Sequence, residues 1–299
     1  MSLRIGTRAS ALATAQAGTV AEALGGELVP IVSDGDRSTA SLASLGGSGV
    51  FATALREALR AGEVDAVVHS FKDLPTAPAD GLAIAAVPKR ADARDVLCAR
   101  GGLDLESLPA GARVGTGSPR RRAQIAARRP DLELVDIRGN IDSRLERLTT
   151  EDPERALDAV ILAAAGLARI GRLEAVSQFL PLDTWPTAPA QGALAVETRA
   201  GDERHAARLD HRPTRLAAEA ERGVLARLEA GCAAPIGAHA FLEDDLLFLT
   251  ARAYRPDGGE HVTSSHAAFP DADAPAELAA RVSDELLALG AAELAPLHD

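Results

Sequence analysis

The order of short apolar runs and helical patterns constrains the fold of this chain more than any other feature. Strand-like runs at residues 3–6, 28–32 and 66–69 alternate with helical patterns at 9–24 and 50–61. Strands that alternate with helices in this way predict βαβ units, in which helices cover the faces of a mostly parallel sheet. The first third of the chain is therefore expected to be an α/β unit.

The same alternation begins again after the turn-rich residues 101–111. Its strand-like runs and helical patterns lie at 113–116, 118–129, 134–137, 141–148 and 159–162. An apolar run at 193–196 comes later, and its place in the order allows it to return to the first sheet. We expect two similar α/β units, the first of them discontinuous in the sequence.

The pattern changes beyond residue 211. A long helix is expected at 213–229, strands near 238–242, 246–253 and 261–267, and a final helix near 276–289. This order is typical of a small α+β domain. The predicted division is a first α/β lobe of residues 1–90 and 192–210, a second α/β lobe of 95–187, and a C-terminal α+β domain of 212–299.

Composition limits the class of protein. The 299 residues have a net charge of −11 and contain no apolar run near the ~18 residues that span a bilayer. The first residues lack the apolar core of a signal peptide. The two cysteines, Cys98 and Cys232, cannot form a disulfide framework or a cysteine-rich zinc site. We expect a cytoplasmic protein with no membrane segment and no metal site.

The positive charge is almost entirely arginine. Lys72 and Lys89 are the only lysines among 32 basic residues, and residues 113–147 hold nine arginines against five acids. Arginine binds carboxylate or phosphate through two hydrogen bonds at once. The acidic total and the small number of aromatic residues argue against nucleic acid as a partner. A nucleic-acid binder that uses residues 113–147 remains a third, weaker reading.

The first candidate motif is Gly-Thr-Gly-Ser-Pro-Arg-Arg-Arg at residues 115–122, where a strand passes into a helix. Ser118 suits the N-cap position, and three arginines follow in the first turn, where the helix dipole disfavours cations. A bound anion would offset that defect. Arg138 and Arg144 flank the next strand-to-helix junction, and ligands bind where parallel strands end. The alternative is that Arg120, Arg121 and Arg122 point to solvent.

The second candidate motif is His-Ser-Phe-Lys-Asp-Leu-Pro-Thr at residues 69–76, directly after an apolar run. Asp73 could transfer a proton or stabilise a developing positive charge. Simple turn chemistry for Asp73 and a core position for His69 are the alternatives. A nucleophilic pair of His69 and Ser70 is disfavoured, because neighbours on a strand point to opposite faces.

The third candidate motif is Gly-Cys-Ala-Ala-Pro-Ile-Gly at residues 231–237. Cys232 lies outside any apolar periodic run, which favours a reachable nucleophile or a covalent anchor over a core position. An ordinary loop thiol is the alternative. Cys98 lies within an apolar run and is expected to be a buried strand residue.

Together these segments resemble the hydroxymethylbilane synthase family, also called porphobilinogen deaminase. The matching stretches are 4–13 with Gln16, 69–75, 115–121, 138–145, 165–169, 191–193 with Glu197, and 231–237. That family joins four porphobilinogens head to tail, releases ammonia at each step and frees hydroxymethylbilane by hydrolysis. The resemblance implies a monomer with two lobes folded like those of periplasmic binding proteins, and an active site between them.

The resemblance also implies roles for single residues. Cys232 matches the cysteine that holds a dipyrromethane cofactor through a thioether, and Asp73 matches the catalytic aspartate. Asp73 is expected to pair with pyrrole N–H groups, assist the departure of ammonia and stabilise a cationic azafulvene-like intermediate. The residues implied for cofactor binding are Lys72, Ser118, Arg120 and Arg121. Those implied for substrate and growing chain are Arg8, Ser10, Arg138, Arg144, Arg169 and Gln191.

Some positions depart from the family pattern. Residues 44–51 resemble its glycine-rich lid, but Ser44 and Ser48 stand where many members have lysine, and Ala190 stands where glycine is usual. The main alternative function is a non-catalytic, two-lobed protein that binds a polycarboxylate. Such a protein would use the same arginines but would need neither Asp73 nor Cys232.

Overall fold

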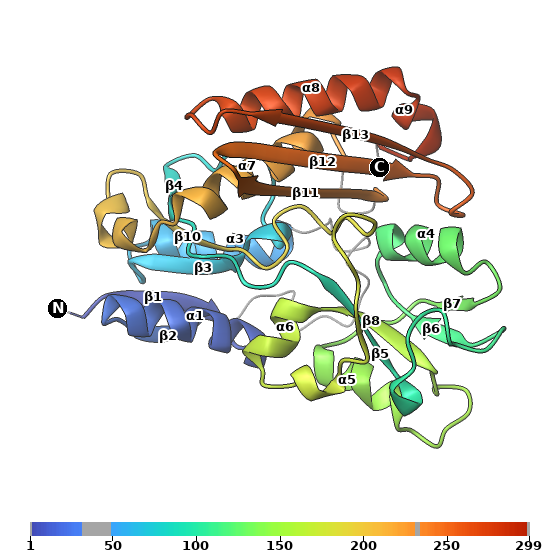
Figure 1. Cartoon of the computed structure of the whole chain (residues 1–299). Helices are drawn as coiled ribbons and strands as arrows, with labels where there is room; N and C mark the ends of the chain where they lie inside the picture. The colour runs from blue at the N-terminus through green and yellow to red at the C-terminus, as the bar shows by residue number, and fades with distance from the viewer. Residues whose placement is uncertain (1, 32–48, 231–233, 298–299) are drawn as a thin grey trace.

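The computed structural model describes residues 2–31, 49–230 and 234–297. Its first sheet has five strands in the order β2-β1-β3-β10-β4 (Figure 1). The strands are β1 (Arg4–Arg8), β2 (Glu27–Ile31), β3 (Ala66–Ser70), β4 (Leu82–Ala86) and β10 (Leu194–Arg199). The predicted return of the run near 193–196 to the first sheet is therefore confirmed.

The second sheet repeats this arrangement in the order β7-β6-β8-β5-β9. Its strands are β5 (Asp95–Ala99), β6 (Arg113–Gly115), β7 (Glu133–Val135), β8 (Ala159–Ala163) and β9 (Gln178–Phe179). In each sheet one strand, β10 or β5, runs antiparallel to both of its neighbours. Each of these strands begins at the edge where the parallel strands end, so its first residues join theirs at that edge.

Two helices cover opposite faces of the first sheet, α1 (Ala11–Leu24) and α3 (Gly49–Arg60). Val68 packs in the same apolar cluster as the buried side of α1, whereas its neighbour Val67 packs with α3. Because successive strand residues point to opposite faces, this separation places one helix on each side of the sheet. Ser10 caps α1 by accepting a hydrogen bond from the Ala13 amide at 3.3 Å.

The second sheet is accompanied by α4 (Pro119–Arg128), α5 (Ile141–Leu145) and α6 (Ala164–Arg169). Ser118 is the N-cap of α4 and accepts from the Arg121 amide at 3.4 Å. The helix expected at 141–148 is shorter than predicted, because α5 ends at Leu145 and a single 3-10 turn follows it.

The remaining residues form a three-stranded antiparallel sheet and its helices, drawn in orange and red at the top of Figure 1. The elements are α7 (Arg212–Arg227), β11 (Ile236–Glu243), β12 (Leu246–Tyr254), β13 (His261–Ala268), α8 (Ala274–Ala288) and α9 (Ala291–Leu294). Buried residues of α7, α8, β11 and β12 share one apolar core, and partly buried residues of β13 pack against it. The expected fold class, two doubly wound α/β units followed by a small α+β unit, is confirmed. Among the helices of the described ranges, none is long and apolar enough to cross a membrane.

Candidate active site

The predicted site residues follow the carboxyl ends of parallel strands. Arg8 is the last residue of β1, Lys72 and Asp73 follow β3, and Ser118 follows β6. Gln191 lies just before the antiparallel strand β10 and therefore reaches the same edge. The alternation of strands and helices that the sequence predicts therefore places these side chains at the ends of strands, where ligands bind in α/β sheets.

One buried carboxylate contacts three of the predicted site residues, Arg120, Arg121 and Gln191. Asp95, the first residue of β5, is 0% exposed. It accepts hydrogen bonds from Arg121 Nη2 at 2.6 Å, Gln191 Nε2 at 2.8 Å, Arg120 Nη2 at 2.9 Å and Trp185 Nε1 at 3.0 Å. Burial opposes its ionisation, but the two guanidiniums and these hydrogen bonds hold the pKa of Asp95 well below its usual range.

The Asp95 cluster, as it is called here, consists of Asp95, Lys72, Arg120, Arg121, Trp185 and Gln191. It carries more positive than negative charge. Lys72 Nζ donates to Gln191 Oε1 at 3.1 Å. Asp95 thus faces Arg120, Arg121 and Lys72, and burial lowers the pKa of Lys72. Arg121 Nε is buried and has no hydrogen-bond partner among the described residues. A buried donor left unpaired costs roughly 1–3 kcal/mol, so the cluster suits a further anionic acceptor.

The burial of Arg120 and Arg121 excludes one alternative that the sequence left open for them. Their exposed fractions are 3% and 7%, so the interpretation of these two as solvent-facing is wrong. Both terminal nitrogens of Arg120 already donate within the protein, to Asp95 and to the oxygens of Gln124 and Pro186. Asp95 therefore supplies part of the negative charge that the arginines at the start of α4 require. Sequence analysis missed this residue.

The other predicted arginines differ in their surroundings. Arg169 donates to the Gly192 carbonyl at 2.8 Å, and Arg144 donates to the Gly139 carbonyl at 3.0 Å. Burial, and then the charges of Arg121 and Arg138, lower the pKa of Arg144, which places it in the field of the Asp95 cluster. Arg138 is more than half exposed, with Nη2 3.5 Å from Asp136.

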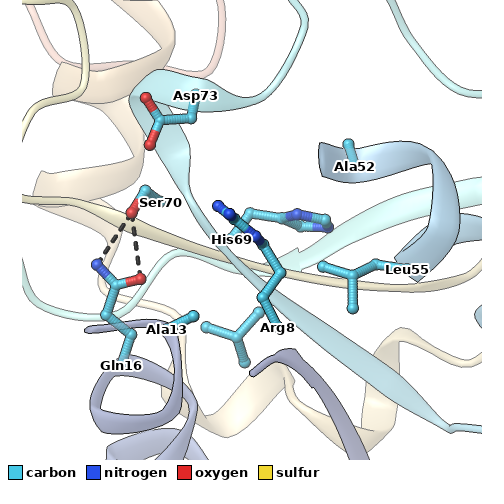
Figure 2. Close-up of a pocket in the computed structure, with 9 residues that line it drawn as sticks. Arg8, Ala13, Gln16, Ala52, Leu55, His69, Ser70 and Asp73 are labelled. Atoms are coloured by element: carbon cyan, nitrogen blue, oxygen red, sulfur yellow. Dashed lines mark hydrogen bonds between the residues drawn. The ribbon is translucent and has the colours of Figure 1, made fainter. Parts of the chain in front are cut away.

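A pocket of about 50 Å³ lies beside Asp73 in the first sheet's unit. Its polar lining consists of Arg8, Gln16, His69, Ser70 and Asp73 (Figure 2). The Asp73 carboxylate points toward Ser70, whose Oγ donates to Gln16 Oε1 at 3.1 Å and accepts from Gln16 Nε2 at 2.9 Å. Asp73 itself is exposed, so its carboxylate is accessible to a ligand in this pocket.

His69 is held by partners of its own. Its Nε2 lies 3.1 Å from Glu197 Oε2, and Arg56 Nη2 donates to Glu197 Oε1 at 2.8 Å. Both His69 and Glu197 are buried. The alternative of a core position for His69 is therefore confirmed. Ser70 pairs with Gln16 instead, as expected for neighbours on a strand.

Helix α7 reaches this site through two adjacent charges that sequence analysis did not single out. Arg222 donates to the carbonyls of the turn that carries Asp73, and Glu221 accepts from Arg90 Nη1 at 2.6 Å and from the Ala190 amide at 2.5 Å. Ala190 has φ of 61°, a left-handed conformation that explains why glycine is usual there. The missed signal was a pair of charges on a helix face that is otherwise uncharged.

Of the two cysteines, only Cys98 lies within the described residues. Cys98 is 0% exposed in β5, and burial raises the pKa of its thiol to about 12, as expected for a core residue. Cys232 lies in the connection between α7 and β11, and it falls outside the described residues. The predicted lid serines, Ser44 and Ser48, also lie outside them.

Two family models together match most of this chain. Residues 3–207 match the family model of the porphobilinogen deaminase dipyromethane cofactor binding domain, and residues 215–288 match that of the porphobilinogen deaminase C-terminal domain. A TRAP periplasmic solute binding protein from Ralstonia eutropha H16 aligns over 70% of this chain and 75% of its own, with 13% identity. Its TM-score is 0.33, a likeness that bears on neither substrate nor activity.

Two curated relatives cover almost the whole chain. The porphobilinogen deaminase of Leifsonia xyli subsp. xyli is 58% identical over 99% of this chain and 94% of its own length. The porphobilinogen deaminase of Cutibacterium acnes is 51% identical over 99% of this chain and 97% of its own. This chain belongs to the porphobilinogen deaminase family.

Proposed function

We propose that this chain condenses four porphobilinogen molecules head to tail into hydroxymethylbilane, on a dipyrromethane bound to Cys232. As a member of its family the chain is a transferase of tetrapyrrole biosynthesis with a dipyrromethane cofactor. The observation that carries the proposal is the surplus positive charge of the Asp95 cluster, which adjoins the accessible carboxylate of Asp73. Carboxylated pyrroles need such cations, and their condensation needs a carboxylate nearby.

The Asp95 cluster fits a dipyrromethane, each pyrrole of which carries two carboxylates. The bound cofactor supplies the pyrrole end to which the chain is added. Arg121 Nε is a buried donor without a partner in the described residues, and a cofactor carboxylate would satisfy it. Lys72 follows β3 of the first sheet, and Ser118 follows β6 of the second. Arg120 contributes mainly through its charge, since its terminal nitrogens are already engaged.

Substrate and growing chain would lie against the remaining strand ends. Each condensation adds two carboxylates, and each carboxylate can accept two hydrogen bonds from one guanidinium. The residues assigned to this task are Arg8, Ser10, Arg138, Arg144, Arg169 and Gln191. Gln191 acts through orientation, because its amide links Lys72 to Asp95 with both hydrogen bonds at 3.1 Å or less.

Asp73 would act on the reacting atoms. The bond between the aminomethyl carbon and nitrogen breaks, ammonia departs, and positive charge develops on the pyrrole. A carboxylate beside that charge lowers the barrier, whereas a cation in the same place would raise it. We expect Asp73→Asn to lose the condensation and Asp73→Glu to retain the charge at a misplaced position, with a slower reaction. Full turnover by Asp73→Asn would exclude this role.

The decisive experiment is the intact mass of the purified protein. The wild type should carry two pyrrole units, Cys232→Ser should carry none, and Cys98→Ser should match the wild type. An unmodified wild-type mass with no turnover of porphobilinogen would overturn the proposal. Unmodified protein that still bound the substrate would instead favour the non-catalytic polycarboxylate-binding alternative.

The remaining assignments concern organisation. We propose three domains, formed by residues 1–90 with 192–210, 95–187, and 212–299, in a cytoplasmic monomer that binds no nucleic acid. The separate sheets and cores of the described residues support this division. Light scattering tests the monomer, and cell fractionation tests the cytoplasmic location. DNA affinity at several salt concentrations tests the absence of nucleic-acid binding, since a basic patch would give a steep dependence.

A further inference from the structure

A second pocket, of about 300 Å³, lies where α4 meets β12 of the C-terminal sheet. Its main lining side chains are Gln124, Arg128, Trp185, Arg252, Tyr254 and His261. It shares no lining residue with the pocket beside Asp73. The volume would hold one ring with its substituents, and the proposed function gives this pocket no task.

One wall of this pocket holds two cations. Arg128 Nη2 and Arg252 Nη1 donate to the same backbone carbonyl, that of Thr184, at 3.1 and 3.2 Å. Neither guanidinium forms an ion pair with a carboxylate of the described residues, and the described lining includes no acid. Two guanidiniums that converge without a counter-ion favour an anionic ligand.

The rest of the lining is aromatic to a degree unusual for this chain. Only 3% of the residues are Phe, Trp or Tyr, yet the single tryptophan and the single tyrosine both line this pocket. Trp185 is fully buried at the base of the pocket, and the centre of the His261 ring lies 5.6 Å from that of the Tyr254 ring. The Arg128 guanidinium lies 5.3 Å from the centre of the Trp185 ring, and that of Arg252 lies 5.9 Å from the centre of the Tyr254 ring. A planar ring that carries a carboxylate would stack on these guanidiniums, which the buried aromatic rings support.

The pocket also contacts the Asp95 cluster directly. Trp185 Nε1 donates to Asp95 at 3.0 Å, and Gln124 Oε1 accepts from Arg120 Nη1 at 2.6 Å. Gln124 Nε2 in turn donates to the Tyr254 hydroxyl at 3.0 Å. A ligand that shifted Trp185 or Tyr254 would therefore alter the hydrogen bonds that hold Asp95 and Arg120.

We propose that this pocket binds a small planar aromatic carboxylate and that its occupancy acts on the Asp95 cluster. It is a second site, separate from the one proposed for condensation. The ligand class follows from the paired guanidiniums and the aromatic base. The coupling follows from Trp185 and Gln124, which line the pocket and form hydrogen bonds with Asp95 and Arg120.

Trp185 is the built-in reporter for the test, because its fluorescence is the only tryptophan signal of the chain. Titration of the holoenzyme with phthalate or benzoate should change that fluorescence to saturation, whereas cyclohexanecarboxylate and inorganic phosphate should act far more weakly. Arg252→Gln and Arg128→Gln should each weaken phthalate binding about tenfold. Arg128 is exposed, so its variant preserves the test if Arg252→Gln does not fold.

The matched control is Arg255→Gln, which removes the same charge just beyond β12. Arg255 pairs with Asp257 and Glu260 and does not line the pocket, so its variant should keep wild-type affinity. The absence of a saturable response, or equal affinity in all variants, would overturn the site. An equal response to cyclohexanecarboxylate would overturn the aromatic ligand class.

Kinetics test the coupling separately. Phthalate should lower kcat for porphobilinogen without raising KM, and Arg252→Gln should relieve this inhibition. Competitive inhibition would place the probe in the condensation site and overturn the proposal, and unchanged turnover at saturating phthalate would overturn the coupling. The fluorescence titration needs no turnover, so failure of this site and failure of the proposed function can be distinguished.

Discussion

Arg222 of α7 donates from Nη1 to the carbonyl of Phe71 at 2.8 Å, and its guanidinium lies 4.5 Å from the centre of the Phe71 ring. The same nitrogen donates to Leu74, and Nη2 donates to Pro75, at 2.7 and 2.6 Å. These three carbonyls bracket Asp73. The helix that precedes the connection with Cys232 therefore also fixes the turn that carries the proposed catalytic carboxylate.

Replacement of Arg222 should reduce turnover more than substrate binding. Arg222→Gln cannot reach three carbonyls, so the turn should move and Asp73 should be misplaced. Each lost charge-assisted hydrogen bond is worth roughly 1.5–3 kcal/mol, and a tenth of the wild-type kcat corresponds to about 1.4 kcal/mol. We expect kcat to fall at least about tenfold with a smaller change in KM, measured by steady-state kinetics.

The control for Arg222 is Arg227→Gln on the same helix, where Arg227 is exposed and pairs with Asp284 at 3.0 Å. It should retain wild-type kcat. Arg222→Lys should recover only part of the activity, because an ammonium lacks the planar fork. A variant that unfolds at lower temperature but keeps its kcat would show that Arg222 stabilises the fold without positioning Asp73.

Glu221 should make stability depend on pH in the acid range. Burial alone would raise its pKa, but Arg90 and, after it, His239 lower it from 4.5 to about 2. Because the unfolded chain takes up this proton first, the stabilisation is complete above about pH 4.5 and is lost as the pH falls toward about 2. Denaturant unfolding at several pH values should show a smaller decline across this window in Glu221→Gln than in the wild type.

Near neutral pH, Glu221→Gln should lower the free energy of unfolding by about 3–5 kcal/mol, because Arg90 loses its buried partner. Glu219→Gln is the matched control, since Glu219 is an exposed residue of the same helix that pairs with Arg215 at 3.2 Å. Equal losses in both variants would contradict a special role for the buried pair.

The sequence predicted what depends on periodicity. The alternation of strands and helices, the return of β10 to the first sheet and the gathering of Lys72, Asp73 and Ser118 at strand ends all follow from local patterns. In contrast, β9 has only two residues and exists through its pairing with β5. A strand of that length has no period of its own.

The buried centre of the site could not be predicted for a related reason. Asp95 begins an apolar run, where an acid is as compatible with a turn as with a buried strand. Its partners Arg120 and Gln191 lie 25 and 96 residues away, so only the folded sheet brings them together. Arg222 was missed similarly, because the carbonyls that it binds lie about 150 residues earlier.

Lys72 should limit activity on the alkaline side. Burial lowers its pKa below the usual 10.5, and the Arg121 charge acts in the same direction. As the pH rises through that lowered pKa, Lys72 loses its charge, and binding of carboxylates should weaken. Lys72→Arg keeps a positive charge at alkaline pH, so the alkaline fall of kcat/KM should move to higher pH. Lys89→Arg changes the other lysine, which is exposed, and should leave the profile unchanged.

Thiol titration should distinguish the two cysteines. Cys98 is fully buried with a pKa raised to about 12, so almost none of it is thiolate at neutral pH, and the native protein should react slowly at this position. If Cys232 is held in a thioether, the denatured wild type should expose a single reactive thiol, and denatured Cys98→Ala should expose none. Two thiols in the denatured wild type would contradict a cofactor bound at Cys232. If one thiol of the native protein reacts rapidly, and one also does so in native Cys98→Ala, the reactive group is a free Cys232.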